Sequence, residues 1–480
     1  MVFTVFRIVC VLTGIVGLTY MIPICAAIYC QEYQVLSSFI IPMAVSIAVA
    51  LLALFLGRKN KTSLSTRSGY VVVALSWVTA SLFGAIPLYL SGAFPSITDA
   101  VFESVSGFTT TGSTIIADVE SLPRSINLWR CQTNWLGGMG IVALTVALLP
   151  LLGVGGFQLI KNETTGVEKG KLTPKIANTA KILWFLYFGF TIAETVLLKI
   201  AGMDFIDALS HSFSTLGTGG FSTRNDSIAS YKSPVIDWIV IIFVFLAGVN
   251  FNLYYYAICK KFSEIRKNSE FKVYIAIVLL STVIISLLES SRYGGFFKSI
   301  RYSFFQTVSV ITTAGFSNDN YAQWTPSSQS IILALFLIGG CSGSTAGGVK
   351  IIRWIILGKQ LHNEFLKLLH PHGKFMMRID QKVGRKDLVF NVAAFLFTYT
   401  CVVLGTTFFT SLFGMDLFTS LTGAMAMAGN VGEAFNQLAP GCSFGFLPSI
   451  VKWWYCMVMI AGRLEFFSIV IFFSPSYWKK

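Results

Sequence analysis

The sequence predicts an all-α integral membrane protein in which four non-identical helix–loop–helix repeats surround one pseudo-four-fold axis, preceded by two extra transmembrane helices. Three observations lead to this fold class. Of the 480 residues, 54% are hydrophobic and only 12% are charged, whereas a soluble domain carries about 25% charged residues. Apolar runs of about 20 residues, the length that crosses a bilayer, fill the chain. Four similar polar segments recur between these runs.

Apolar windows place the predicted membrane helices. The ten windows are 5–30, 36–56, 70–91, 131–153, 182–201, 235–257, 273–288, 329–357, 389–413 and 446–473. The first window has one basic residue, Arg7, before its apolar stretch and no credible small-residue cleavage site. We therefore expect a retained span and not a cleaved signal peptide.

The basic residues lie mostly on one side of this topology. The formal net charge is +14, which in a soluble protein could indicate a nucleic-acid partner. Most Lys and Arg residues fall instead in alternate loops and at the two ends of the chain, namely in 57–67, 157–181, 259–272 and 350–387 and at Arg7, Lys479 and Lys480. Retention of positive residues on the cytoplasmic face explains this skew. The charge therefore predicts cytoplasmic termini and contact with inner-leaflet lipids, and no nucleic-acid partner.

Cysteine and histidine give no sign of a transition-metal site. The nine cysteines are scattered, without a C-x-x-C pair or metal-ligand spacing. We interpret them as small apolar residues and expect no structural transition metal. His370-Pro371-His372 is interpreted as part of a solvated loop, since two histidines without further ligands rarely hold a metal.

Four polar segments in the outward loops form an internal repeat. They read SVSGFTTTGST (104–114), HSFSTLGTGGFST (211–223), TVSVITTAGFSND (307–319) and GAMAMAGNVGEAF (423–435). Each contains a glycine at the corresponding place, and these are Gly112, Gly220, Gly315 and Gly432. Sixteen residues before each glycine stands a good helix N-cap: Ser96, Asp204, Ser299 and Asp416. The helix between cap and glycine is too short to cross a hydrocarbon core of about 30 Å, so we expect four re-entrant helices.

The residues that end each re-entrant helix suit a cation. Such a helix directs its carbonyl end, which carries about half a negative charge, into the membrane centre. Irregular backbone at this depth is tolerated where it lines a cavity, and rings of backbone carbonyls can replace the hydration shell of K⁺. The sequence therefore predicts one pore with a potassium-binding filter. Its candidate residues are Thr110, Thr111, Gly112, Thr218, Gly219, Gly220, Thr313, Ala314, Gly315, Asn430, Val431 and Gly432.

A plainer interpretation takes the four segments as ordinary polar turns. Their shared position and the cap at a constant offset favour the pore. None of the four copies reads T-V-G-Y-G, the filter sequence of tetrameric potassium channels, and the copies differ from one another. The symmetry is therefore expected to be approximate, and discrimination among K⁺, Rb⁺ and Na⁺ looser than in a channel with four identical loops.

The eighth window, 329–357, is predicted to be a broken helix. Five glycines fall within ten residues of its middle, and each costs up to about 1 kcal/mol relative to alanine in a helix. Close helix packing by small residues is the competing interpretation, and a phosphate-binding loop is rejected because the G-x-x-x-x-G-K-[ST] spacing does not fit. The break lies below the third filter segment and is predicted to gate the pore. The candidate gate residues are Gly340, Cys341, Ser342, Gly343, Ser344, Thr345, Gly347, Gly348, Lys350 and Arg463.

Arg463 is a charge inside the last window and is therefore expected to be functional. Its predicted partners are carbonyls and hydroxyls of the broken segment, such as those of Ser342, Ser344 and Thr345. A structural ion pair with Glu194 or Glu465 is the alternative.

Several motifs together resemble the TrkH/TrkG/KtrB superfamily of bacterial potassium transporters. They are GGCSGSTAGGVKIIRW, WLGGMGIVALTVALLP (135–150), GTGGFST, TTAGFS, GNVG and GRLE. The resemblance covers nearly the whole chain and is closest to the TrkH branch, because two helices precede the first repeat. It implies a K⁺ uptake channel or transporter in the bacterial inner membrane, a homodimer with one ion pathway per subunit, a filter at the four loops and a gate at 339–350.

The resemblance also implies a cytosolic partner, a TrkA-like ring of nucleotide-binding regulatory domains, which we expect to dock on 157–181 and 350–387. K⁺ is the only cofactor expected, as the transported ion. At Glu433 the chain has an acid where members of this family often have a small residue or proline, and this side chain is expected to concentrate cations at the pore mouth.

The repeats define five segments. These are 1–66 (extra helix pair), 67–160, 161–265, 266–375 with the gate loop 339–350, and 376–480.

Two other classes of function compete with a gated pore. The first is an ion-coupled K⁺ symporter that rocks around a midplane site, but such transporters carry broken helices in corresponding positions of two inverted halves. Here the repeats are parallel and only one broken span is expected. The second is an intramembrane enzyme, for which the sequence has no Ser/His/Asp order, H-E-x-x-H motif or paired intramembrane aspartates. We therefore expect no catalytic residues.

Overall fold

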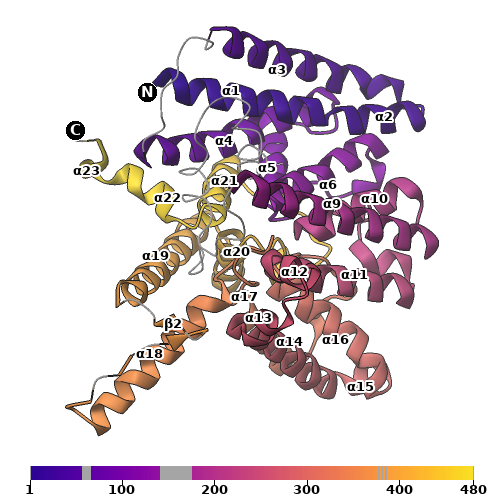
Figure 1. Cartoon of the computed structure of the whole chain (residues 1–480). Coiled ribbons are helices and arrows are strands. Elements are labelled where there is room, and N and C mark those ends of the chain that lie inside the picture. The colour runs from indigo at the N-terminus through magenta and orange to yellow at the C-terminus, as the bar shows by residue number, and fades with distance from the viewer. Residues whose placement is uncertain are drawn as a thin grey trace.

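The computed structural model describes residues 2–56, 66–140, 176–373, 375–376, 378–380, 382–383 and 386–478. The second half of the predicted span 131–153, nearly all of the basic interval 57–67, most of 157–181, and Lys479 and Lys480 lie outside these residues. Among the described residues, the regular secondary structure is almost entirely helical (Figure 1).

Two N-terminal spans precede the repeats, as predicted. Their elements are α1 (Val2–Thr19), α2 (Met21–Tyr29), the short 3-10 turn η1 (Tyr33–Val35) and α3 (Leu36–Leu56). The first two helices form one apolar span of 27 residues, from Phe3 to Tyr29. Figure 1 shows α1 and α3 at one edge of the molecule, where α1 packs on α3 and α4 and α2 packs on α6.

Each repeat contributes an outer helix, a short helix and an inner helix. The outer helices are α4 (Thr66–Leu90), α9 (Ile176–Ile200), α14 (Ser269–Leu288) and α19 (Lys386–Ser411). The short helices are α5 (Ile97–Phe108), α10 (Phe205–Gly217), α16 (Phe296–Ile311) and α20 (Leu417–Gly429). The inner helices are α6 (Arg124–Gly138), α11 (Pro234–Ala247) with α12 (Phe251–Ile258), α17 (Pro326–Phe336) with α18 (Ile351–Leu369), and α21 (Ser449–Arg463) with α22 (Phe467–Val470).

Smaller elements join these helices. They are the 3-10 turns η2 (Val119–Ser121), η4 (Ser227–Tyr231), η5 (Tyr321–Gln323), η6 (Asn436–Leu438) and η7 (Ile471–Phe473), the helices α13 (Phe262–Lys267), α15 (Ser290–Tyr293) and α23 (Pro475–Trp478), and the strands β1 (Arg378–Ile379) and β2 (Lys382–Val383). The two strands form an antiparallel pair in which Arg378 faces Val383.

The repeats close into a ring by a single packing rule. Each short helix packs on the inner helix of the preceding repeat: α10 on α6, α16 on α11, α20 on α17 and, closing the circle, α5 on α21. The short helices α5, α10 and α20 are mostly buried, as is the second half of α16, whereas outer helices expose large apolar side chains such as Phe185 and Phe408. Apolar side chains exposed in this way face lipid in a membrane protein. The predicted fold class, four helix–loop–helix repeats about a pseudo-four-fold axis, is confirmed.

The chain is a multi-pass membrane protein, but its spans differ from the predicted ten. Among the described residues six helices are long and apolar enough to cross a membrane, or seven if α11 and α12 are taken as one span bent by 93°. The described inner helices α6, α17 and α21 have 15, 11 and 15 residues, fewer than the about 20 residues that a membrane-spanning helix needs.

The prediction of a single broken span is wrong. Besides the break between α17 and α18, the inner helix of the second repeat breaks at Gly248–Asn250 and that of the fourth breaks after Arg463. A side chain at Gly248 would lie 2.5 Å from Thr312 and 2.7 Å from the Tyr274 hydroxyl, so close packing against the third repeat fixes that break. In the fourth repeat Glu465 and Phe466 both have positive φ values, of 53° and 55°, and such a backbone cannot continue a right-handed helix.

Three of the four predicted N-caps are correct. Ser96, Asp204 and Asp416 each accept a hydrogen bond from a backbone N–H in the first turn. Ser299 is not a cap, because α16 begins one turn earlier with Gly295 as the capping residue. Gly295 has a φ of 136°, a conformation that favours glycine, so the change of direction occurs before Ser299.

Candidate functional site

The four short helices end with the same backbone geometry. The residue two positions before each repeat glycine is left-handed, with φ of 56° at Thr110, 50° at Thr218, 56° at Thr313 and 55° at Asn430. The next N–H bonds the carbonyl five residues back, at 2.8 Å (Thr111 to Ser106), 2.9 Å (Gly219 to Ser214), 2.8 Å (Ala314 to Ser309) and 2.9 Å (Val431 to Ala426). Glycine usually occupies the left-handed position of this helix ending. Threonine there is strained, and strain of this kind gathers at functional sites.

The glycines that follow form a closed ring with the carbonyl groups of the neighbouring repeats. A Cβ on Gly112 would lie 1.9 Å from the Gly219 oxygen, one on Gly220 2.2 Å from the Ala314 oxygen, one on Gly315 2.4 Å from the Val431 oxygen, and one on Gly432 2.2 Å from the Thr111 oxygen. These distances exclude any side chain, and all four glycines are left-handed. The structure therefore brings all twelve predicted loop residues together around one axis. We call the four glycines and the four carbonyl groups the carbonyl ring.

Side chains of one repeat tie the ring to the next. Asn430 donates from Nδ2 to Thr111 Oγ1 at 2.9 Å, and the Ser113 hydroxyl donates to the Gly432 carbonyl at 2.8 Å. These bonds join the first and fourth loops. The Tyr321 hydroxyl donates to the Ala434 carbonyl at 2.8 Å and joins the third loop to the fourth.

A buried ion pair that the sequence analysis missed stabilises the first loop. Glu103 on α5 and Arg130 on α6 are 0% and 1% exposed, with 2.8 Å between Arg130 Nε and Glu103 Oε1. Glu103 also accepts bonds from the Thr114 hydroxyl and the Ile115 N–H, each at 2.9 Å. Arg130 in turn donates to the Ser222 carbonyl of the second loop at 3.3 Å. The available signal was an acid and a base, each beside an apolar residue in the middle of a helix.

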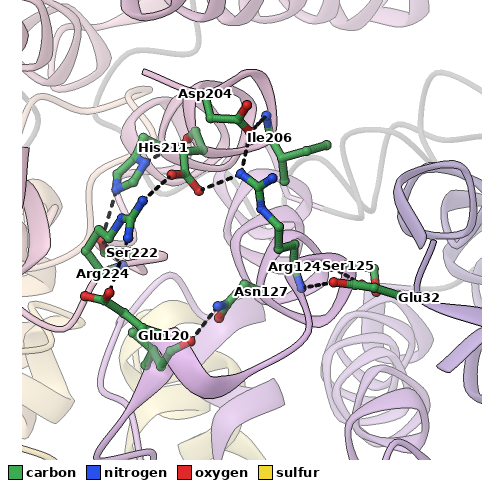
Figure 2. A network of polar contacts seen from close by, with 12 residues as sticks. Glu32, Glu120, Arg124, Ser125, Asn127, Asp204, Ile206, His211, Ser222 and Arg224 are labelled. Atoms are coloured by element: carbon green, nitrogen blue, oxygen red, sulfur yellow. Dashed lines mark hydrogen bonds and ion pairs between the residues drawn. The ribbon is translucent and has the colours of Figure 1, made fainter. Parts of the chain in front are cut away.

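Ion pairs also join short helices to the preceding inner helices. Figure 2 shows Arg124, at the start of α6, pairing with Asp204 at the start of α10. Arg224 donates to Asp207 at 3.0 Å and to Glu120 at 3.2 Å in the same network.

The first and third repeats have their own versions of this contact. Lys452 of α21 pairs with Asp99 of α5 at 2.7 Å. In the third repeat the polarity is reversed, since Arg301 of α16 pairs with Asp237 of α11 at 3.4 Å. At the fourth short helix Asp416 accepts a bond from the Thr419 N–H at 3.0 Å. Ion pairs therefore join three of the short helices to the preceding inner helices, with charges of different sequence position and sign, whereas the bond of Asp416 lies within α20.

A cavity lies over the outward side of the ring. It is lined by all four ring glycines and by Glu433, the only carboxylate among the described residues that line it. Burial raises the pKa of Glu433 to about 8, against the opposing effect of the Ser317 hydroxyl. Arg130 and Arg224 also line this cavity, and both are paired with carboxylates. The predicted place of Glu433 at the mouth agrees with this geometry.

The segment 337–350, between α17 and α18, lies against the inward side of the ring. The Gly347 N–H donates to Thr313 Oγ1 at 2.7 Å, and a Cβ on Gly347 would lie 2.6 Å from the Gly429 carbonyl. The other flank of this segment packs on the break in the second repeat, where the Cys341 N–H donates to the Gly248 carbonyl at 3.0 Å. We call 337–350 the inner loop.

Arg463 contacts the inner loop through backbone. Its guanidinium donates to the Thr345 carbonyl at 3.0 Å and to the Gly137 and Gly138 carbonyls at 2.6 and 3.1 Å. The predicted carbonyl partner Thr345 is therefore correct. The acceptors at the end of α6 were not predicted, although a cation is favoured at a helix C-terminus.

The predicted hydroxyl partners of Arg463 bond elsewhere. The Ser342 hydroxyl donates to Glu270 at 3.1 Å and the Ser344 hydroxyl to the Cys341 carbonyl at 2.6 Å. Glu465 pairs with Arg353 of α18.

Lys350 closes the inner loop on itself. Its ammonium group donates to the Ala346 carbonyl and, at 3.3 Å, to the Gly347 carbonyl. The predicted gate residues thus form one contiguous structure directly beneath the ring.

Comparison with known proteins gives consistent matches over the full length. A profile of the TrkH family, described as a cation transport protein, matches residues 36–288 and 295–480. The chain is 36% identical to the Trk system potassium uptake protein TrkH of Escherichia coli K12 over 442 residues, 91% of each protein. It is 34% identical to TrkG of the same organism over 476 residues, 98% of this chain and 97% of TrkG. The crystal structure of the potassium transporter TrkH from Vibrio parahaemolyticus superposes with a TM-score of 0.89 at 32% identity, covering 100% of both chains.

Proposed function

The chain belongs to the TrkH family of cation transport proteins, and from this premise we propose that it conducts K⁺ into a bacterial cell through the carbonyl ring. The carbonyl ring is the observation that carries this proposal. Four helix C-termini point their partial negative charge at one axis, and extended backbone places carbonyl oxygens around it. Carbonyl oxygens so arranged can replace the water shell of K⁺. The relatives named potassium uptake proteins support K⁺ as the ion.

The twelve loop residues are the proposed filter. The neighbouring carbonyls come from Thr111, Gly219, Ala314 and Val431, which carry different side chains. Because the ring is held by unequal contacts, we expect weaker discrimination between K⁺ and Rb⁺ or Na⁺ than in a symmetric filter.

The inner loop is the proposed gate. Gly347 bonds the base of the filter at Thr313, so an ion leaving the ring on its inward side meets this loop. The bonds of Arg463 to Thr345 and to the end of α6 hold the loop in that position. Opening requires that these backbone acceptors be released.

Membership of the family also supports proposals about the location, the oligomeric state and the partner of this chain. We propose an inner-membrane location with cytoplasmic termini, a homodimer with one pathway in each subunit, and regulation by a TrkA-like nucleotide-binding ring on the cytoplasmic side. The helix α18 projects from the body of the molecule in Figure 1 and exposes Leu368 and Leu369, so it offers a surface for such contacts. The five proposed segments are 1–66, 67–160, 161–265, 266–375 and 376–480.

An ion-coupled K⁺ symporter of the same family is the second candidate. The two additional breaks in the inner helices favour it, because broken helices line the ion sites of many secondary transporters. The parallel arrangement of the repeats favours the channel. Saturable K⁺ flux that stops when a proton or sodium gradient is removed would support the symporter.

A glycine substitution in the ring tests the filter. Gly315→Ser places a Cβ 2.4 Å from the Val431 oxygen, so we expect growth of a K⁺-uptake-deficient bacterium at low K⁺ to be lost and Rb⁺ uptake to fall by about tenfold or more. Gly294→Ser is the matched control, because Gly294 has a φ of 69° against 70° for Gly315 and nothing lies within 4 Å of its Cβ position. Normal growth and normal ion ratios with Gly315→Ser would contradict the proposal.

A further inference from the structure

Glu270 makes an unusual set of contacts at the base of the inner loop. It is the second residue of α14 and is 4% exposed. One carboxylate oxygen, Oε1, accepts hydrogen bonds from the Ser342 N–H at 2.7 Å, the Ser342 hydroxyl at 3.1 Å and the Ile352 N–H at 3.1 Å. A single carboxylate oxygen on the third outer helix therefore binds two segments of chain, one within the inner loop at Ser342 and one just after the loop at Ile352.

The two segments of chain that begin and end the inner loop also form backbone hydrogen bonds with each other. The Gly339 N–H donates to the Val349 carbonyl at 2.8 Å and the Ile351 N–H to the Gly340 carbonyl at 3.3 Å. The inner loop is therefore a closed structure with Gly347 at its apex under the ring and Glu270 across its base. The apex cannot move away from the ring as a unit without changing the bonds at the base.

The position of Glu270 is electrostatically favourable in this arrangement. A carboxylate is stabilised near a helix N-terminus, and Glu270 lies in the first turn of α14 while bonding the first turn of α18. If the loop left, Glu270 would lose three donors in a buried site. An unpaired buried charge is strongly destabilising, so the carboxylate favours the closed loop.

We propose that Glu270 is the latch of the inner loop: its carboxylate holds Ser342 and Ile352 together and thereby keeps the loop beneath the ring. This inference rests on the proposed function, in which the inner loop obstructs the pathway. Glu270 is a positioning residue, because it acts through the loop and does not touch the ring. Since Ile352 belongs to α18, displacement of that projecting helix must also break the latch.

The first test measures flux and loop exposure in the full-length protein. Cys341 is a natural reporter, because it precedes Ser342 and is 1% exposed. In inside-out vesicles we expect Glu270→Ala to raise resting Rb⁺ leak severalfold and to raise labelling of Cys341 by a water-soluble maleimide about tenfold. The same labelling measured on the Cys341→Ser variant gives the contribution of the other cysteines, which is subtracted. Glu270→Gln keeps a carbonyl oxygen in the same place, so its Rb⁺ leak and Cys341 labelling should lie closer to the wild-type values than those of Glu270→Ala.

Glu289 supplies the matched structural control. It lies at the other end of α14, is 2% exposed, and accepts bonds from the Thr325 N–H at 2.8 Å and the Thr325 hydroxyl at 2.7 Å. Glu289→Ala removes a similar buried cap far from the inner loop, so it should lower thermal stability without raising leak or Cys341 labelling. Equal leak and labelling in the two alanine variants would overturn the latch, because general loosening would then explain both.

A deletion separates failure of the latch from failure of the gate. Removing 341–347 should raise leak whether or not Glu270 is a latch. If the deletion raises leak but Glu270→Ala leaves flux and Cys341 labelling unchanged in folded protein, the latch is wrong and the gate stands. If the deletion itself leaves flux unchanged in folded protein, the proposed gate is wrong and the latch falls with it.

Discussion

The outer and inner sides of the carbonyl ring are built in opposite ways. On the outer side every repeat contributes an equivalent loop, and ion pairs or hydrogen bonds join neighbouring repeats around the circle. On the inner side one repeat alone supplies the inner loop, which contacts the second repeat, the ring and Arg463. A site that surrounds an ion needs contributions from all sides, whereas one insertion is enough to obstruct a pathway. Symmetry is thus retained where an ion is proposed to bind and lost where it is proposed to be stopped.

The nature of the contacts differs as well. The outer side depends on buried charges, of which Glu103 and Arg130 are the deepest. Loss of one partner from such a pair leaves an uncompensated charge. The inner loop is held by hydrogen bonds to its backbone, which come from other backbone groups and from the charged side chains of Glu270 and Arg463 and contribute about 0.5–3 kcal/mol each. The outer side should therefore be rigid and the inner loop able to move.

The largest expected effect is on the outer side. Glu103→Ala leaves the buried Arg130 without its carboxylate and should destabilise the protein by about 3–5 kcal/mol, seen as a large fall in the unfolding temperature of detergent-solubilised protein. Glu364→Ala is the control, since its ion pair with Lys367 is exposed on α18 and should leave that temperature unchanged. Similar stability of the two variants would show that the outer side is not held by this pair.

A smaller effect is expected from the inner loop, and it should be of a different kind. Deleting 341–347 should raise leak about tenfold, a change of about 1.4 kcal/mol in the barrier, while leaving the ratio of K⁺ to Na⁺ flux as in the wild type. Gly220→Ala, which places a Cβ 2.2 Å from the Ala314 oxygen, should change that ratio. Tracer fluxes of both ions in proteoliposomes measure this. A changed ratio in the deletion variant would mean that the inner loop also selects.

The smallest expected effect concerns Glu433 in the outer cavity. Its pKa is raised to about 8, so the carboxyl is mostly neutral at pH 7 and gains its negative charge as the external pH rises through 8. A negative charge beside the ring attracts cations, and partial screening by water limits the gain. We expect the apparent KM for K⁺ to fall by about threefold between pH 6.5 and pH 9.

Glu433→Gln should remove this pH dependence while retaining uptake. The arginines that share the cavity, Arg130 and Arg224, are both paired with carboxylates. A pH response that persists in Glu433→Gln would assign the titration to another group.

The sequence by itself determined much of the ring. The four glycines, the residues before them and three of the four helix caps were correctly predicted from spacing, because a short re-entrant helix needs a cap, a length and a flexible end within one stretch of chain. The break before Lys350 was predicted for the same reason, since five nearby glycines weaken a helix locally. Each of these properties depends on neighbours in sequence.

Only the tertiary structure decided what holds these pieces in place. The pairs Glu103–Arg130 and Asp99–Lys452, the acceptors of Arg463 on α6, and the contacts of Glu270 all join residues far apart in the chain. The break at Gly248 depends on packing against Thr312 and Tyr274 of another repeat. Buried charges and close approaches are determined by what lies across the interface, and one sequence specifies those neighbours only after the chain has folded.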